Sequence, residues 1–383
     1  MKIVGIICEY NPLHLGHRKQ IRLVRQHFGP DTAVVCLMRG NFVQRGAPAV
    51  FDKSLRAEAA VKCGADLVLE LPVEYCLSSA EGFAAGGVSI LSGFCDVLSF
   101  GAETGEASSL IATAQALLSS DFSRYLREKL DLGLSFPAAR QAALEAMGTD
   151  AALLAKPNDI LAVEYCKAIL SQGSGMEVYP VRRGGDYHDT CADEEDPSAT
   201  SLRRLIAAGE DWLPFVPEEA AGCFRSAAVH ILEAGERAML AKLRSMTEEE
   251  FSRLPYGSEG LWRKLMHAVR QKATLEEILM AVKSKRYTRT RLDRMVMCAF
   301  LGLTEGDLKK KPPYTRVLAL NDRGRTVLKK ARETGRFLNA GEKPEDDYWQ
   351  RERLAGDLYG LFCHGTPEAP GQEENRRIWY CRE

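Results

Sequence analysis

The chain lacks several features that would place it in common protein classes. None of its 11 cysteines forms a Cys-x-x-Cys pair, so the spacings typical of structural zinc sites and dithiol redox motifs are absent. No apolar stretch is long enough to span a bilayer, and the first apolar run ends at Glu9, too early for a signal peptide. Internal repeats and low-complexity blocks are also missing. With scattered cysteines suited to reduced thiols, these absences predict a cytoplasmic globular protein.

The composition has little excess charge of either sign. The 51 Lys and Arg residues against 52 Asp and Glu residues give a formal net charge of −1. The overall charge therefore identifies no partner, and only its distribution along the chain is informative. A length of 383 residues exceeds one typical core, so two domains are expected.

The first 200 residues alternate between strand-like and helix-like patterns. Short apolar runs typical of buried parallel strands lie at residues 2–8, 33–38, 67–71 and 97–100. Helical patterns lie between them, at residues 17–28, 53–63 and 80–91. This alternation predicts an α/β fold whose ligand lies beyond the carboxyl ends of the strands. Further helices are expected at residues 106–118, 122–132, 136–147, 218–243, 260–271 and 295–301, and further strands at residues 177–181 and 316–320.

A polar turn follows the first strand and contains the sequence His14-Leu15-Gly16-His17. The pattern predicts that this turn leads into a helix N-terminus, where unpaired N–H groups attract phosphate. Gly16 would let the backbone approach a ligand closely. His14 and His17 could donate hydrogen bonds to oxygens whose charge grows during transfer at phosphorus. The alternative is that both histidines merely finish a turn, but the preceding strand favours a nucleotide-handling site.

A second candidate for phosphate binding begins at Ser198. This serine is suited to cap a helix, and Arg203 follows close to the start of that helix. Because a cation at a helix start opposes the helix dipole, Arg203 points to an anionic ligand such as a triphosphate. The acidic residues 193–196 before it are interpreted as a solvated turn.

The strongest charge cluster covers residues 283–294, where six basic residues accompany one acid and one aromatic. Tyr287 and threonines are interleaved with the basic residues, which suits phosphate contacts and stacking on RNA bases. A solvated basic face is the alternative. This segment alone therefore leaves nucleic-acid binding open.

Taken together, these segments resemble the bacterial tRNA-methionine cytidine acetate ligases, a branch of the nucleotidylyltransferase superfamily. The resemblance is carried by residues 9–17, 40–46, 64–72, 100–103, 156–161, 187–189, 198–203, 258–261 and 283–294, and it thins after about Lys343. His-x-Gly-His specifies only the superfamily, whereas the Phe-Val-Gln-Arg-Gly and Lys-Arg-Tyr-Thr segments narrow the resemblance to the family. Two positions depart from the family pattern: Leu15 is often polar in relatives, and Arg39 is commonly a small residue.

The resemblance implies a Rossmann-like parallel-sheet nucleotidylyltransferase domain at residues 1–209. A mainly helical tRNA-binding domain with a small C-terminal α+β segment would follow at residues 210–383. The implied reaction has two steps: ATP and acetate form acetyl-adenylate and pyrophosphate, and the acetyl group then moves to N4 of the wobble cytidine of elongator methionine tRNA. Magnesium would accompany ATP, and no tightly bound metal is expected.

The resemblance, with the local patterns above, also assigns roles to residues. His14 and His17 are the expected catalytic residues, as donors to oxygens around the α-phosphate. The residues expected to bind ATP are Ile7, Cys8, Glu9, Tyr10, Asn11, Pro12, Leu13, His14, Leu15, Gly16, His17, Arg18, Lys19, Gln20, Gly101, Asn158, Arg182, Arg183, Ser198, Thr200 and Arg203. The residues expected to bind tRNA are Lys283, Lys285, Arg286, Tyr287, Arg289, Arg291 and Arg294.

Two other functions fit the same residues. An adenylyltransferase for a small phosphorylated metabolite explains the His-x-Gly-His site but leaves the basic C-terminal half without a task. A protein that binds ATP and tRNA without turnover is a candidate of another class. The oligomeric state, the selection of acetate over longer acids and the general base of the second step are left open. His188 and Asp189 are candidates for that base by neighbourhood, and a structural turn is the alternative.

Overall fold

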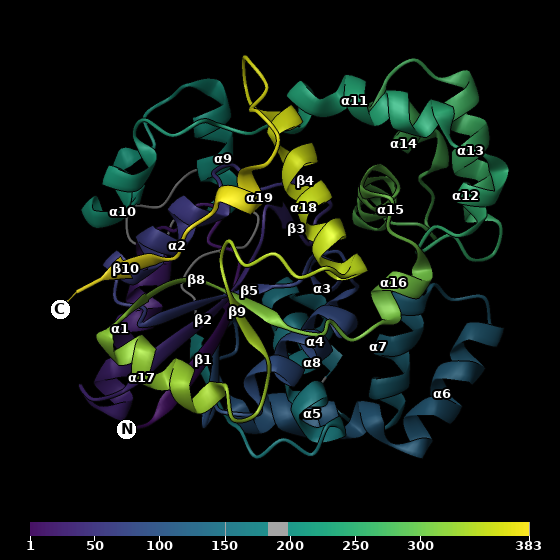
Figure 1. Ribbon diagram of the computed structural model, residues 1–383. Coiled ribbons are helices and arrows are strands. Elements are labelled where there is room, and N and C mark those ends of the chain that lie inside the picture. Colours follow the sequence, from purple (N-terminus) through teal and green to yellow (C-terminus); the bar gives the residue numbers. More distant parts are fainter. Residues whose placement is uncertain (150, 183–197, 383) are drawn as a thin grey trace.

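The computed structural model describes residues 1–149, 151–182 and 198–382, and a mixed β-sheet runs through it (Figure 1). The strand order is β10-β8-β5-β2-β1-β6-β7, and β9 pairs with β8. The strands of this sheet are β1 Ile3–Cys8, β2 Ala33–Arg39, β5 Leu67–Leu71, β6 Val97–Ala102, β7 Glu177–Arg182, β8 Thr315–Asn321, β9 Phe337–Asn339 and β10 Trp379–Cys381. The five strands from β5 to β7 in this order are parallel, as the sequence predicts.

Helices cover both faces of the sheet because its central strands are apolar on both sides. Alternate residues of β2 belong to two different cores: Val35 and Leu37 to one, Cys36 and Met38 to the other. The first core also contains side chains of α4 Ala80–Leu91, α5 Ala107–Leu118, α8 Pro157–Ser171 and α17 Asp322–Ala331. The second contains side chains of α1 Leu15–Phe28, α2 Lys53–Lys62, α9 Ala199–Ala208 and α10 Glu218–Phe224.

A group of helices in the upper right of Figure 1 encloses a third core, which includes Phe251, Leu265 and Met295. These helices are α11 Leu232–Ser245, α12 Glu248–Ser252, α13 Leu261–Gln271, α14 Leu275–Val282 and α15 Arg289–Leu301, with α18 Asp347–Tyr359 beside them. The remaining α-helices are α3 Val73–Cys76, α6 Ser120–Asp131, α7 Phe136–Ala146, α16 Glu305–Lys309 and α19 Gln372–Asn375, and the remaining strands are the short pair β3 Phe42–Val43 and β4 Ala47–Pro48. No helix in the described part of the chain is long and apolar enough to cross a membrane.

Two parts of the arrangement differ from the sequence-based expectation. The prediction of one continuous helix at residues 218–243 is wrong, because this segment forms two separate helices, α10 and α11. Between them His230 donates its backbone N–H to Val50 and forms a β-bridge with Cys363. The strand expected at residues 316–320 exists as β8, but it pairs antiparallel with β5 in the main sheet. The segment after residue 314 thus adds strands to the main sheet, while the domain division at residue 209 and the C-terminal α+β segment stay predictions.

A buried ionic network joins the C-terminal segment to the loop after β2. Its carboxylates are Asp52, Glu70, Glu352 and Glu373, and its cations are Lys53, Arg316 and Arg376. Four acids against three bases leave one negative charge without a counterpart. Burial and the neighbouring Glu70 charge accordingly raise the pKa of Glu352 to about 8. A Cβ on Gly40 would lie 2.5 Å from Glu70 Oε1, so the loop approaches this network closely.

Candidate nucleotide-binding site

A cavity of about 240 Å³ opens at the carboxyl ends of β1, β2, β6 and β7. This is the position in which open α/β sheets bind ligands. Most of the residues expected to bind ATP line it: Ile7, Cys8, Glu9, Tyr10, Asn11, His14, Gly16, His17, Lys19, Gln20, Gly101, Asn158, Arg182, Ser198, Thr200 and Arg203. Segments separated by almost 200 positions in the chain therefore meet around one cavity.

Four residues of the expected ATP set do not line the cavity: Pro12, Leu13, Leu15 and Arg18. Leu13 is fully buried in the core beneath α1, and Arg18 forms an ion pair with Glu219 at 3.0 Å. A contiguous stretch cannot line one cavity throughout, because successive residues of a turn and helix point in different directions. Arg183, His188 and Asp189 lie outside the described residues.

The two histidines of the motif lie side by side at the start of α1. His14 is the N-cap residue, and the ring centroids of His14 and His17 are 3.7 Å apart. The backbone N–H of His14 donates to Nδ1 of His17 at 3.2 Å. Because Nδ1 accepts this hydrogen bond, the neutral His17 ring carries its proton on Nε2. His17 therefore offers one N–H donor from a ring whose orientation is set by the helix N-terminus.

The first turn of α9 is tied to the turn after β1. The hydroxyl of Ser198 accepts from the backbone N–H of Ser201 at 3.1 Å, which caps α9 as the sequence predicts. Arg203 Nη1 donates to the carbonyl of Asn11 at 2.8 Å, and its Nη2 donates to Thr200 Oγ1 at 3.1 Å. The N-termini of two helices and the Arg203 guanidinium thus face one cavity. Their combined positive potential favours a polyphosphate.

The opposite end of the cavity is formed by the ends of β6 and β7 and the start of α8. Asn158 Nδ2 donates to Glu103 Oε1 at 2.8 Å, and Asp159 Oδ1 accepts the backbone N–H of Glu103 at 2.8 Å. These bonds lock the strand end that contains Gly101 to the helix that contains Asn158. The helix α8 has no counterpart among the expected helices, although its first turn lies in a segment that carries the family resemblance.

Sequence reasoning missed part of the cavity wall. Arg39, Gln44, Arg45, Phe83 and Tyr165 also line it. The side chain of Arg39 is 3% exposed, forms an ion pair with Glu9, and lies with its guanidinium carbon 3.8 Å from the centroid of the Phe83 ring. The Phe-Val-Gln-Arg-Gly segment gave a signal for Gln44 and Arg45, whereas no local pattern indicated the aromatic residues.

Only part of the basic cluster at residues 283–294 is exposed to solvent. Tyr287 is 4% exposed and belongs to the helical core, so its expected stacking on RNA is wrong. The side chains of Lys264 and Arg291 lie over its ring, at 5.6 and 5.3 Å from the centroid. Arg289 is ion-paired with Glu276 and Asp293, both at 2.7 Å.

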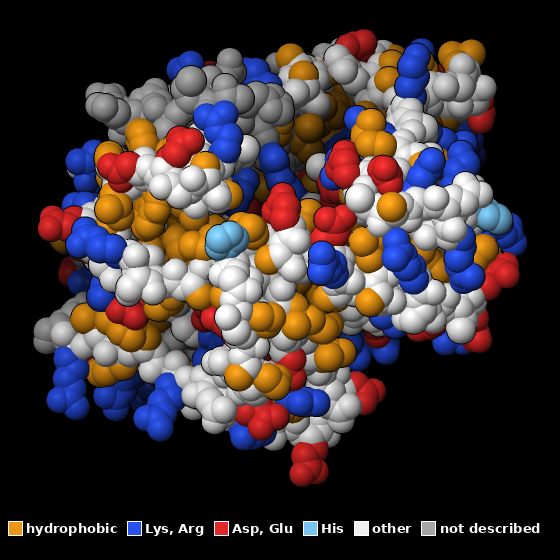
Figure 2. All heavy atoms as spheres, turned by 90° about the horizontal axis from the view of Figure 1, so that it is seen from above, with side chains coloured by type: hydrophobic (Ala, Val, Ile, Leu, Met, Phe, Trp, Pro, Cys, Tyr) orange, Lys and Arg blue, Asp and Glu red, His pale blue; other side chains and the backbone are white. Residues whose placement is uncertain are grey.

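Lys283, Lys285 and Arg286 are the exposed basic side chains of the cluster. Arg286 forms an ion pair with Glu259. Seen from above, the molecule carries Lys and Arg side chains on its right-hand part, where the helical group lies (Figure 2).

The start of α15 touches the loop that lines the cavity. A Cβ on Gly46 would lie within 2.5 Å of backbone atoms of Asp293 and Arg294, and the φ of Gly46 is +73°. Only glycine satisfies both the contact and the dihedral angle. Gln44 and Arg45, which line the cavity, therefore lie directly next to the basic cluster.

One group of potential metal ligands occurs in the described part of the chain, formed by His230, Cys363 and Glu368. His230 Nε2 lies 3.2 Å from Glu368 Oε2, and its ring stacks on Tyr359 at 3.9 Å. None of these residues lines the cavity.

The chain is similar to known proteins over most of its length. The model of the HIGH nucleotidyl transferase family matches residues 1–374. A tRNA(Met) cytidine acetate ligase of Acetivibrio thermocellus is 32% identical over 99% of this chain and 99% of its own length, and one of Clostridium novyi is 36% identical over 87% and 88%. The crystal structure of apo Thermotoga maritima TmcAL is 28% identical, covers both chains fully and superimposes with a TM-score of 0.91. The structure of that protein bound to alpha-thio ATP gives a TM-score of 0.87 at the same identity and coverage.

Proposed function

The chain belongs to the HIGH nucleotidyl transferase family and, within it, to the tRNA(Met) cytidine acetate ligases, and we propose on this premise how its residues perform the reaction. The protein is an ATP-dependent ligase that activates acetate and acetylates N4 of the wobble cytidine in elongator tRNA(Met). The observation that carries the assignment of its active site is the convergence of His14, His17 and Arg203 on one cavity at the carboxyl ends of the strands.

In the first step an acetate oxygen attacks the α-phosphorus of ATP. A bond from the acetate oxygen to the α-phosphorus forms, the bond from the α-phosphorus to the α,β-bridging oxygen breaks, and pyrophosphate leaves with the electron pair. The protein must align the two reactants and stabilise negative charge, since little covalent chemistry is left for it. We assign His14 and His17 to the α-phosphate oxygens. Arg203, with the N-termini of α1 and α9, would hold the β- and γ-phosphates.

Adenosine occupies the end of the cavity near Gly101, Asn158 and Arg182 in this assignment. Glu9 is the one carboxylate among the described residues that line the cavity, and it is ion-paired with Arg39. Magnesium prefers oxygen ligands and keeps several of its waters. We therefore propose that magnesium reaches the site bound to the phosphates of ATP rather than held by the protein.

In the second step the N4 amine of the cytidine attacks the acetyl carbonyl, and AMP leaves. An anticodon-loop base is already single-stranded, so presenting it costs less than extracting a base from a duplex. Lys283, Lys285 and Arg286 would bind the tRNA backbone. These three residues precede α15, and α15 packs against Gly46. We therefore expect a tRNA bound to them to lie near the loop of Gln44 and Arg45, which lines the cavity.

The experiment uses radiolabelled acetate with ATP, with and without tRNA(Met). The proposal expects acetate-dependent exchange of pyrophosphate into ATP without tRNA, and label in N4-acetylcytidine only when tRNA(Met) is present. An adenylyltransferase for a phosphorylated metabolite would show no acetate-dependent product. A protein that binds ATP and tRNA without turnover would bind both and exchange nothing.

A further inference from the structure

A cluster of potential metal ligands has no role in the assignment above. His230 lies between α10 and α11, whereas Cys363 and Glu368 follow the short 3-10 helix η3 Gly360–Phe362. One ligand atom from each of the three residues lies within 4.8 Å of the other two. None of the three lines the nucleotide-binding cavity. We call His230, Cys363 and Glu368 the His230 cluster.

Backbone contacts fix the two chain segments that form the His230 cluster. His230 and Cys363 are opposite each other in an antiparallel β-bridge, and the backbone N–H of His364 donates to the carbonyl of Val229 at 2.7 Å. In Figure 1 the yellow C-terminal segment accordingly passes beside the start of α11. Residues that are opposite each other in an antiparallel pair have neighbouring side chains. Two of the three potential ligands are therefore brought together by the fold itself.

The distances in the cluster suit a zinc ion. His230 Nε2 lies 3.2 Å from Glu368 Oε2. Tetrahedral zinc has bonds of about 2.0–2.2 Å to nitrogen and oxygen, which place two such ligand atoms about 3.4 Å apart. A zinc–sulfur bond of about 2.3 Å places sulfur about 3.6 Å from these atoms. Because Cys363 Sγ is already within 4.8 Å, a shift of roughly 1 Å is enough to complete three corners of a tetrahedron.

The protein satisfies the polar groups of the cluster only in part. The side chain of His230 is 1% exposed, and its Nδ1 has no hydrogen-bond partner among the described residues. Its ring stacks on Tyr359, with centroids 3.9 Å apart, and this contact uses neither ring nitrogen. Buried polar atoms normally have partners. A histidine kept only for packing would therefore be paired on both nitrogens, and the ring of His230 is better explained as a ligand.

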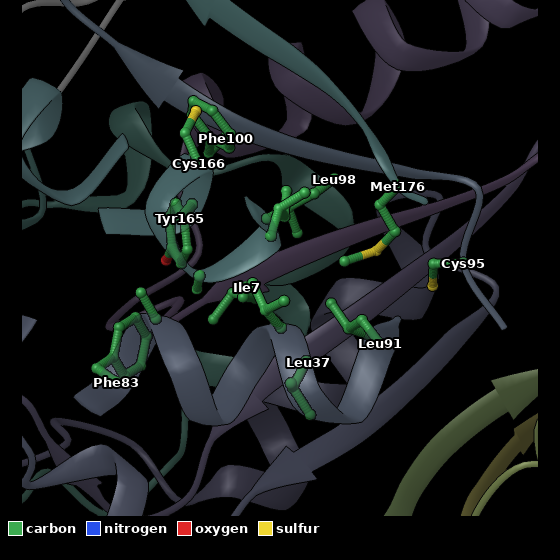
Figure 3. Close-up of a cluster of buried hydrophobic side chains, with 14 of the residues drawn as sticks. Ile7, Leu37, Phe83, Leu91, Cys95, Leu98, Phe100, Tyr165, Cys166 and Met176 are labelled. Atoms are coloured by element: carbon green, nitrogen blue, oxygen red, sulfur yellow. The ribbon is translucent and has the colours of Figure 1, made fainter. Parts of the chain in front are cut away.

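Cys363 differs from the other buried cysteines that the structure describes. Cys95 and Cys166 lie among apolar side chains, as Figure 3 shows. The remaining ones also belong to apolar cores, at Cys8, Cys36, Cys63, Cys76, Cys223 and Cys298. Cys363 is 8% exposed but belongs to none of the apolar cores formed by the described residues. A buried cysteine usually acts as a small hydrophobe, whereas Cys363 lies beside a ring nitrogen and a carboxylate.

We propose that the His230 cluster binds one zinc ion through His230, Cys363 and Glu368, with water as the fourth ligand. Imidazole and thiolate favour zinc, whereas magnesium and calcium prefer oxygen ligands. The thiol proton leaves to solvent when the ion binds, so one thiolate and one carboxylate balance the two positive charges. The side chain of Glu368 is 30% exposed, which gives the ion and the water a path to the site. This inference goes beyond the proposed function and departs from the expectation, drawn from the family resemblance, of no tightly bound metal.

The ion has a structural role in this proposal because the cluster does not line the cavity. The backbone N–H of His230 donates to the carbonyl of Val50 at 2.9 Å. Tyr359, on which the His230 ring stacks, donates its hydroxyl to the carbonyl of Ala49 at 2.8 Å. Ala49 and Val50 lie a few residues after Arg45, which lines the cavity. The ion would thus fasten the C-terminal segment behind the loop that forms part of the cavity wall.

The test is a titration of the full-length protein, dialysed against a chelator, with cobalt(II) alone and without ATP, acetate or tRNA. Cobalt(II) occupies zinc sites, and its bond to a thiolate gives a charge-transfer band in the near ultraviolet. We expect one cobalt ion per chain with this band, and loss of the band when zinc is added. Cys363→Ser should lack the band. Cys381→Ala is the matched control, because Cys381 lies in the same C-terminal segment but outside the cluster, and it should keep the band.

Glu368→Gln provides a second, milder variant. Its amide oxygen can still accept a hydrogen bond from His230, and its side chain is partly exposed, so the variant should fold even if Cys363→Ser does not. We expect its Kd for cobalt to rise by at least about 10-fold. Zinc should also raise the urea midpoint of the wild type and leave that of Glu368→Gln nearly unshifted at the same zinc concentration.

Three results would overturn the proposal: no charge-transfer band in the wild type, a full band in folded Cys363→Ser, or an unchanged cobalt Kd in Glu368→Gln. Circular dichroism establishes that each variant is folded before it is titrated. The titration contains none of the reactants, so its outcome does not depend on whether the protein catalyses acetate-dependent exchange. Failure of the zinc site and failure of the proposed function are therefore distinguishable.

Discussion

Substitution of His17 separates its catalytic role from its structural one. His17 Nδ1 accepts the backbone N–H of His14 at 3.2 Å, and the proton on Nε2 is the donor proposed for the α-phosphate. His17→Ala loses both interactions. Losing one donor to the charge that develops in the transition state costs about 2.7–4 kcal/mol, or 100- to 1000-fold in rate. Losing the contact at the helix start costs only about 0.5–2 kcal/mol of folding stability.

Two conservative variants divide these effects. In His17→Asn the amide oxygen takes the position of Nδ1 and keeps the contact to His14, but no donor reaches the place of Nε2. In His17→Gln the amide nitrogen takes the position of Nε2. We therefore expect His17→Asn to keep the wild-type free energy of unfolding. Its rate of acetate-dependent pyrophosphate exchange should fall by at least about 100-fold. His17→Gln should keep more of the rate than His17→Asn.

The assay is exchange of labelled pyrophosphate into ATP at saturating acetate, with urea unfolding as the measure of stability. ATP binding in the absence of acetate is the control, because one hydrogen bond that strengthens in the transition state contributes little to the ground state. Wild-type exchange by His17→Asn would refute the donor role. A loss of exchange that only tracks a loss of stability would refute it as well.

The remaining predictions concern tRNA binding, the buried ionic network and pH. Lys283→Gln/Lys285→Gln should weaken tRNA(Met) binding. It should also reduce the magnitude of the slope of log affinity against log salt concentration by about 1.4, or 0.7 for each lost phosphate contact. Pyrophosphate exchange without tRNA should be unchanged, and an unaltered slope would contradict this. Lys53→Met removes the cation that contacts the buried carboxylates of Glu70 and Glu373 at 2.5 and 2.7 Å. The free energy of unfolding in urea should therefore fall by about 3–5 kcal/mol. A fall of less than about 1 kcal/mol would argue against a tight network. Burial raises the pKa of Glu352 to about 8, so the folded state retains a proton that the unfolded chain releases, and the free energy of unfolding falls as the pH rises from 5 to 8. Glu352→Gln should remove this part of the fall, and an identical pH dependence of the variant would refute the assignment.

The parts of the fold that are encoded locally could be predicted from the sequence. The run at residues 2–8 and the His-x-Gly-His turn specify a strand, a turn and a helix start from neighbouring residues alone, and the structure confirms all three. Ser198 as the cap of α9 is confirmed for the same reason. Each of these features depends on contacts within a few residues of sequence.

The parts that depend on long-range contacts could not be predicted. Tyr287 looks like an exposed aromatic within a basic run, but the helical core that buries it comes from segments on both sides of it in the sequence. Arg39 reads as the polar end of an apolar strand. Its surroundings depend on which helix packs over that face of the sheet, and periodicity within β2 does not identify that helix. The antiparallel pairing of β8 with β5 joins Leu67 to Leu320 and leaves no local signal in either segment.

That pairing has a consequence for how the protein is made. As the polypeptide leaves the ribosome, β5 is complete once residue 71 has emerged, but its partner β8 begins only at Thr315. For most of translation the nascent chain therefore presents an unpaired hydrophobic strand edge, the kind of surface on which aggregation starts. Products that terminate before residue 315 keep this edge, so premature termination yields aggregation-prone fragments rather than a smaller working enzyme.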